Sequence, residues 1–170
     1  MADSARRLGA VEGRTKMLSK KAKYALRALL VLADHAGEAA PVPISTIAGR
    51  ERISRKFLEA ILVELRDSGL LDSQRGRHGG YRLARPPDEI SFAEVIRTID
   101  GPLAPIACAS RTQFRPCTDC RDVGTCAIRW AMLKARDALA GALDDCSLAD
   151  ALQRKGKRIA DRGIITPAAR

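Results

Sequence analysis

The sequence has no long hydrophobic run, few aromatic residues and too few acidic residues to balance its basic ones. No stretch of about 18 apolar residues occurs, so we expect no membrane-spanning helix. Residues 1–16 carry scattered charges without the apolar segment of a signal peptide, so we expect a cytoplasmic protein. Aromatic residues make up only 4% of the chain, which leaves Leu, Ile, Val and Ala to build a mainly helical core.

The charge balance points toward a polyanionic partner. Thirty Lys and Arg residues against twenty Asp and Glu residues give a formal net charge of +10. Such a charge attracts nucleic acid at long range and raises the rate of encounter. Charge alone is equally compatible with a basic protein that binds no nucleic acid, so the residue pattern has to decide between the two.

The pattern of apolar residues predicts a helix-turn-helix. An amphipathic helix is expected from Ser19 to about His35, followed by a short helix from Ile44 and a longer one ending near Ser68. Ser54 is a plausible N-cap of the longer helix. Its apolar stripe is formed by Phe57, Leu58, Ile61, Leu62 and Leu65.

A β-hairpin is expected directly after these helices. Residues 70–73 and 80–83 read as short strands, and the basic, glycine-containing segment 74–79 joins them. A helix pair followed by a basic hairpin is a winged helix-turn-helix. A further helix is expected over residues 91–100, so the fold class is mainly α with a small β-hairpin wing.

The C-terminal part of the chain is expected to contain a sensor loop and a dimerisation helix. Residues 101–126 are irregular and hold four of the five cysteines. The long helix that follows has a narrow face with small residues, suited to close packing against a second copy of itself, formed by Ile128, Ala131, Met132, Ala135, Leu139, Ala142 and Leu143. We divide the chain into a disordered leader (1–16), a DNA-binding domain (17–100), a cysteine-rich loop (101–126), a dimerisation helix and final turn (127–152) and a basic tail (153–170).

Two groups of polar residues are candidates for contacting double-stranded DNA. In a helix-turn-helix, the exposed N-terminal residues of the second helix meet base edges and phosphates. Here these are Ser54, Arg55, Lys56 and Glu59. The wing adds Arg75, Arg77 and His78, and Arg75 is the first candidate for groove contact.

The cysteines of the loop are candidate metal ligands. Thiolates are soft ligands, and several within one loop suit an iron-sulfur cluster or zinc. The spacing Cys108-x8-Cys117-x2-Cys120-x5-Cys126 offers one close pair and two single cysteines, which fits a paired zinc site poorly and favours iron-sulfur binding. The helix after Cys126 should favour a thiolate there. Cys146 follows two aspartates, and we leave it out of the site.

Four segments together resemble the Rrf-two (Rrf2) family of bacterial regulators, which includes IscR, NsrR and RirA. They are Met17–Ala25 (MLSKKAKYA), Ile53–Glu59 (ISRKFLE), Arg75–Tyr81 (RGRHGGY) and the cysteine loop. The resemblance runs from residue 17 to about residue 152. It implies a homodimer joined by the long helix, with a recognition helix and a wing from each subunit on an operator.

The resemblance also implies an iron-sulfur cluster, either [2Fe–2S] or [4Fe–4S], held by Cys108, Cys120 and Cys126. Cys117 is additional and could be the fourth ligand. Arg129 stands where IscR-type members have a histidine, and Lys23 stands where NsrR-type members have an aspartate. The fourth ligand and the type of cluster therefore stay open.

Two alternatives to cluster sensing follow from the same cysteines. The regulator could use a metal-free thiol switch, in which Cys117 and Cys120 form a disulfide. More remotely, Cys117-Thr118-Asp119-Cys120 could serve a thiol oxidoreductase, although no strand-helix redox fold is expected around it. We expect a transcriptional regulator, with repression as the first hypothesis, and not an enzyme.

Overall fold

The computed structural model describes residues 18–155 and 157. The expected leader 1–16 and most of the expected tail 153–170 lie outside these residues. Mostly helical structure with one antiparallel hairpin confirms the expected fold class. The elements are α1 (Lys20–Asp34), α2 (Ile44–Glu51), α3 (Arg55–Asp67), β1 (Leu71–Gln74), β2 (Gly80–Leu83), the 3-10 turn η1 (Pro87–Glu89), α4 (Phe92–Asp100), the 3-10 turn η2 (Ala107–Ala109), α5 (Ala127–Asp144) and α6 (Leu148–Gln153).

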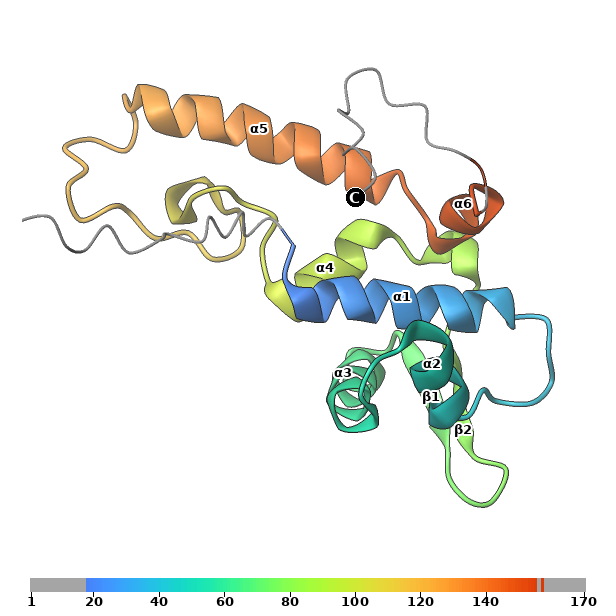
Figure 1. Ribbon diagram of the computed structural model, residues 1–170. Coiled ribbons are helices and arrows are strands. Elements are labelled where there is room, and N and C mark those ends of the chain that lie inside the picture. Colours follow the sequence, from blue (N-terminus) through green and yellow to red (C-terminus); the bar gives the residue numbers. More distant parts are fainter. Residues whose placement is uncertain (1–17, 156, 158–170) are drawn as a thin grey trace, which may run out of the picture.

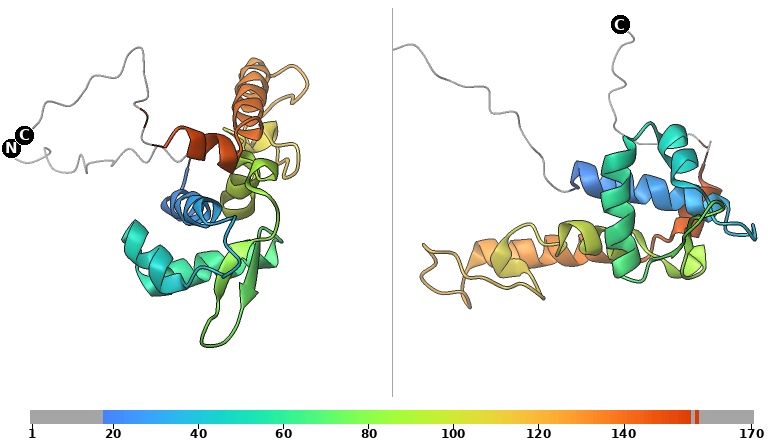
Figure 2. Two further views of the ribbon diagram at one scale, coloured as in Figure 1. Left: turned by 90° about the vertical axis from the view of Figure 1, so that its right-hand side faces the viewer. Right: turned by 90° about the horizontal axis from the view of Figure 1, so that it is seen from below.

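Helix α1 is the centre of the structure. Figure 1 shows α3, α2 and the β1–β2 hairpin on one side of α1, and α4 and α5 on the other. The view from the side in Figure 2 has the same order, with α5 and the hairpin at opposite edges. Within residues 18–155 and 157, no helix is both long and apolar enough to cross a membrane.

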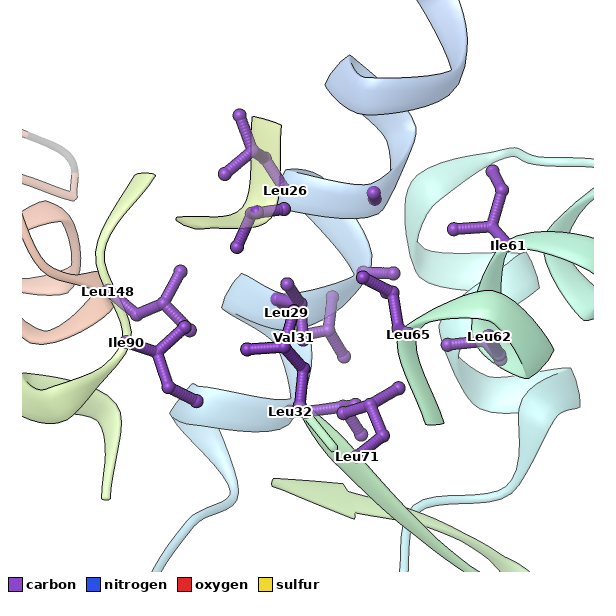
Figure 3. Close-up of a cluster of buried hydrophobic side chains, with 14 of the residues drawn as sticks. Leu26, Leu29, Val31, Leu32, Ile61, Leu62, Leu65, Leu71, Ile90 and Leu148 are labelled. Carbon is purple, nitrogen blue, oxygen red and sulfur yellow. The ribbon is translucent and has the colours of Figure 1, made fainter. Parts of the chain in front are cut away.

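The core is built around the buried face of α1. Figure 3 shows Leu29 and Leu32 of α1 between Leu65 of α3 on one side and Ile90 and Leu148 on the other. All five side chains are at most 2% exposed. Because the aliphatic stripes of α1 and α3 meet here, the helix-turn-helix is fixed rigidly to the rest of the chain.

Serine side chains cap three of the helices. Ser19, Ser91 and Ser147 accept hydrogen bonds from backbone N–H groups in the first turns of α1, α4 and α6, and Ser147 forms a full capping box with Asp150. The expected N-cap Ser54 occupies the cap position of α3, but its hydroxyl makes no capping bond. That hydroxyl is therefore available to a ligand.

A backbone bridge, which the sequence pattern does not predict, joins the hairpin to the linker before α2. Leu71 pairs with Leu83 and Gln74 with Gly80 across the two strands. Val42 and Tyr81 then exchange backbone hydrogen bonds of 2.9 Å in both directions. The base of the wing is thus held from both sides.

Gly80→Ala should destabilise the protein by about 1–3 kcal/mol. A Cβ at residue 80 would lie 2.4 Å from the Val42 carbonyl oxygen, so the Val42–Tyr81 pairing would have to open. Chemical denaturation measures the effect. Gly49→Ala is the matched control, because a Cβ there meets nothing within 4 Å, and in a helix it should stabilise by about 0.5–1 kcal/mol. Equal stability of the two variants would contradict the proposed role of Gly80.

Candidate DNA interface and cysteine site

The first turns of α3 have one buried face and one exposed polar face. Leu58, Ile61, Leu62 and Leu65 are fully buried. The polar residues predicted to meet DNA are all exposed: Ser54, Arg55, Lys56 and Glu59. Among the described residues, none of these four side chains forms an ion pair or a hydrogen bond. Their polar groups are consequently free to meet an external partner.

Several other arginines of the structure form ion pairs with carboxylates. Examples of such pairs are Arg27–Glu51, Arg50–Asp34, Arg85–Glu94 and Arg97–Asp144. An arginine already paired within the protein has less to offer a phosphate. The contrast therefore distinguishes Arg55 and Lys56 from the general basic surface.

The tip of the wing also carries exposed polar side chains. Arg75, Arg77 and His78 are exposed and, within residues 18–155 and 157, have no ion-pair partner. Gly76 has φ of 108°, a conformation that L side chains rarely adopt, so a glycine is needed for this turn. Figure 1 shows the hairpin and α3 on the same side of α1, so both can face one ligand.

The base of α3 is fastened to α1 by polar and aromatic contacts. Lys21 forms a salt bridge with Glu64. The rings of Tyr24 and Phe57 meet edge to face with centroids 5.8 Å apart, and the Arg27 guanidinium lies 5.5 Å from the Tyr24 centroid. Phe57 is 38% exposed, so its placement in the apolar core stripe was wrong, and it packs on α1 from the surface instead.

The loop cysteines differ in exposure, and two of them lie close together. Cys108 is buried within η2, Cys117 is exposed, and Cys120 and Cys126 are half-buried. The Cys117 and Cys108 sulfur atoms are 3.9 Å apart. A turn brings the Cys120 N–H within 3.4 Å of the Cys117 carbonyl. The thiol of Cys117 thus contacts the thiol of Cys108, nine residues earlier.

Mutual proximity affects the acidity of these thiols. The pKa of Cys117 is raised because its thiol donates a hydrogen bond to Cys108 and because a Cys108 thiolate would repel a second negative charge. The pKa of Cys120 is raised by partial burial and then by the neighbouring Cys126 and Cys117. Both groups therefore favour the protonated form until a cation is present to compensate the charge.

Cys126 occupies the N-cap of α5, as expected from the sequence. Its sulfur accepts a hydrogen bond from the Arg129 N–H at 3.4 Å. The positive end of the helix dipole therefore points at this sulfur. Cys146 lies outside the loop, before α6.

The chemistry of the loop suits a metal centre, although its ligands do not yet converge. Within residues 18–155 and 157, no group of three or more Cys, His, Asp or Glu side chains is arranged to hold a metal ion. Two thiolates on one tetrahedral metal with bonds of 2.3 Å stand about 3.8 Å apart. The observed 3.9 Å between Cys108 and Cys117 matches that spacing. The thiols are soft donors suited to a metal ion, and the Cys108–Cys117 pair has the spacing of two thiolates on one metal atom.

A family model described as "Iron-dependent Transcriptional regulator", Rrf2, matches residues 18–154. The chain belongs to the Rrf2 family. It is 45% identical over 132 residues to a putative Rrf2-like HTH-type transcriptional regulator of Rhodobacter capsulatus, covering 72% of this chain and 88% of the relative. It is 34% identical to the transcriptional regulator IscR of Aliivibrio salmonicida, covering 89% and 86% of the two chains.

A solved Rrf2-family structure supports the same assignment. The structure of CymR, the global cysteine regulator of Bacillus subtilis, is similar with a TM-score of 0.66 and 32% sequence identity, covering 80% of this chain and 95% of that one. The resemblance inferred from four sequence segments is therefore confirmed. The protein is a transcriptional regulator of the Rrf2 family, a family of DNA-binding proteins with a winged helix.

In this Rrf2 protein, polar contacts join α4, which precedes the cysteine loop, to α1 and to α5. The Asp100 carboxylate, at the end of α4, accepts a hydrogen bond of 2.7 Å from the Ser19 N–H at the start of α1. The Arg97 guanidinium binds the Asp144 carboxylate through two bonds of 2.6 and 2.8 Å, which attaches α4 to α5. Helix α4 is therefore bonded both to the start of α1 and to the C-terminal end of α5.

Three of these features were beyond sequence analysis. The Cys108–Cys117 contact, the Val42–Tyr81 pairing and the Ser19–Asp100 hydrogen bond have no sequence signature. Each joins residues that only the folded chain brings together.

Proposed function

We propose that this Rrf2 regulator binds an operator through α3 and the wing, and that an iron-sulfur cluster in the 101–126 loop sets its affinity. Cys108, Cys120 and Cys126 are the proposed ligands, with Cys117 as the fourth. The single observation that supports this most strongly is the 3.9 Å distance between the Cys108 and Cys117 sulfur atoms, because two thiolates at that spacing could bind one metal atom.

The proposed DNA contacts follow from exposure and charge. Arg55 and Lys56 lie at the positive end of α3, where backbone N–H groups also attract phosphate. Glu59 can accept from a cytosine amino group, and Ser54 can bond to either partner. Arg75, Arg77 and His78 on the wing would enter the neighbouring groove.

A homodimer through α5 is part of the proposal. No residue of α5 is buried, although the helix has 18 residues. Met132, Leu139 and Leu143 are half-buried, whereas the adjacent stripe of the same face is more open: Ile128 is 69% exposed, and Ala135, Ala138 and Ala142 are also exposed. A stripe of small residues at helical spacing allows two helices to approach closely. The second copy would place two recognition helices about one DNA turn apart.

A bound cluster would supply redox and ligand-exchange chemistry at the loop. The chain itself would hold the four sulfur atoms, exclude water around the buried Cys108 and connect the loop to α4 and α5. Two thiols per metal atom, with Cys108 and Cys117 as one pair, favour the [2Fe–2S] form. In the [4Fe–4S] form each cysteine binds its own iron, so the thiolates do not share a tetrahedral edge.

Anaerobic purification tests the cluster directly. We expect about two iron atoms and two acid-labile sulfides per chain, with visible absorption, and a difference in operator affinity between the loaded and the apo protein. Protein that contains neither iron nor sulfide, and that cannot be reconstituted, would contradict cluster sensing. That result would not contradict the proposed DNA binding. Zinc at one atom per chain would support a different centre.

A metal-free thiol switch is the second candidate, and the geometry changes which pair it would use. The Cys117 and Cys108 sulfur atoms need to approach by about 1.9 Å to bond. Each thiol would lose one proton and one electron. One hydrogen peroxide would accept the two protons and two electrons and become two water molecules. Peptide mapping after peroxide treatment distinguishes a Cys108–Cys117 disulfide from the Cys117–Cys120 disulfide expected from the sequence.

A further inference from the structure

Two arginines on one face of α5 bind the backbone that carries Cys108. The Arg129 Nε–H donates to the Cys108 carbonyl at 2.9 Å, and an Arg136 Nη–H donates to the Ala109 carbonyl at 2.7 Å. The two residues are seven positions apart, which is two turns of a helix and returns to the same face. The 3-10 turn η2 is therefore held against α5 by two hydrogen bonds from arginine side chains to its backbone carbonyls.

Both acceptors and one of the donors are sheltered from water. Cys108 is 3% exposed and Ala109 is fully buried. The Arg136 side chain is only 11% exposed, and its remaining donors bind Asp137. A buried carbonyl that loses its donor cannot turn to solvent, so each bond holds the loop in place.

The Arg129 guanidinium is further positioned by an aromatic ring of the same loop. Its central carbon lies 5.9 Å from the centroid of Phe114. A guanidinium has no acceptor lone pair and stays charged, so it cannot be a metal ligand. Its contact in the structure is the backbone of a proposed ligand, Cys108, and not a sulfur atom.

We propose that Arg129 and Arg136 are positioning residues that clamp Cys108 onto α5, so that any movement of this cysteine moves the helix. The clamp transmits the state of the loop to the helix that would join two subunits. The part of this inference that concerns signalling rests on the proposed function, whereas the clamp itself exists in the metal-free protein.

The first test measures how well Cys108 is protected in the metal-free protein. Arg129→Met removes both donor and charge, and Arg129→Gln keeps an amide nitrogen near the position of Nε while removing the charge. We expect the rate of Cys108 alkylation by iodoacetamide, followed by mass spectrometry relative to Cys146, to rise roughly 5-fold or more in the Met variant. The Gln variant should stay near the wild-type rate.

Lys134→Met is the matched control, because Lys134 is an exposed cation on α5 that lies over Trp130 and bonds to no loop carbonyl. It should leave the labelling of Cys108 unchanged. Arg136→Met should act like Arg129→Met, and if that variant fails to fold, the half-buried Arg129 series is sufficient. If Gln and Met at residue 129 label equally fast, or if neither differs from wild type, the clamp is refuted.

The second test concerns signalling. In reconstituted protein we expect Arg129→Met to shift the visible circular dichroism of the cluster and to bring the ratio of operator affinities, loaded over apo, closer to 1 than in wild type. Arg129→Gln should preserve both. A wild-type ratio of 1 would contradict the proposed function and leave the labelling result standing. A normal wild-type ratio that Arg129→Met does not alter would overturn transmission through the clamp.

Discussion

An Arg75→Ala variant is expected to bind its operator about 5- to 150-fold more weakly than the wild type, equivalent to about 1–3 kcal/mol. Arg75 is exposed on the wing and, among the described residues, has no carboxylate partner, so its full donor set is available to a base edge. The measurement is a titration of a fluorescent duplex selected from a random library by the wild-type protein.

A second duplex of unrelated sequence separates base reading from phosphate binding. If Arg75 reads a base, the loss should be concentrated on the selected duplex, whereas Lys56→Ala should weaken both duplexes alike and flatten the dependence on salt. Arg66→Ala is the charge-matched control, since Arg66 lies at the far end of α3 and is paired with Asp67. Equal losses for Arg75→Ala and Arg66→Ala would show that Arg75 has no special role.

Serine at Cys108, Cys120 or Cys126 is expected to abolish cluster binding, because a neutral hydroxyl is a far poorer ligand for iron than a thiolate. Iron per chain and visible absorption should fall to background. The operator affinity should no longer depend on reconstitution, which removes a coupling of about 1–3 kcal/mol, or roughly 5- to 150-fold in affinity.

Serine substitutions at two further cysteines, Cys117 and Cys146, make this experiment more specific. Cys117→Ser should lower iron retention as strongly as Cys108→Ser if the two thiols share a metal atom, as their 3.9 Å separation suggests. Cys146→Ser is the control and should retain iron, because Cys146 lies outside the loop, before α6. Full retention of iron in Cys117→Ser would exclude Cys117 as a ligand and leave the fourth position to another group.

The fold was predictable because its signals are local. Apolar residues at three- and four-residue intervals mark α1 and α3, serine caps mark where α4 and α6 begin, and glycines around a basic turn mark the wing. Each signal depends on residues within one or two turns of each other. Phe57 was misplaced because a residue at the edge of an apolar stripe has the same spacing whether it points to the core or to a neighbouring helix.

The candidate site was predictable only in part. The sequence alone identified which side chains could meet DNA and which sulfur atoms could bind metal, since exposure at a helix start and clustering of cysteines follow from chain order. Their partners were not predictable: Cys117 approaches Cys108, and Arg136 is bound to a carbonyl 27 residues away.

What the amino-acid order by itself determined was therefore the set of elements and their chemistry: a winged helix-turn-helix, exposed basic residues at a helix start and on the wing, and a thiol-rich loop before a long helix. Only the tertiary structure decided that the buried turn holding Cys108 lies along α5, within reach of Arg129 and Arg136. The physical reason is that helix periodicity and capping act over a few residues. The path of an irregular loop is chosen by which buried carbonyls and charges find partners, and those partners come from distant parts of the chain.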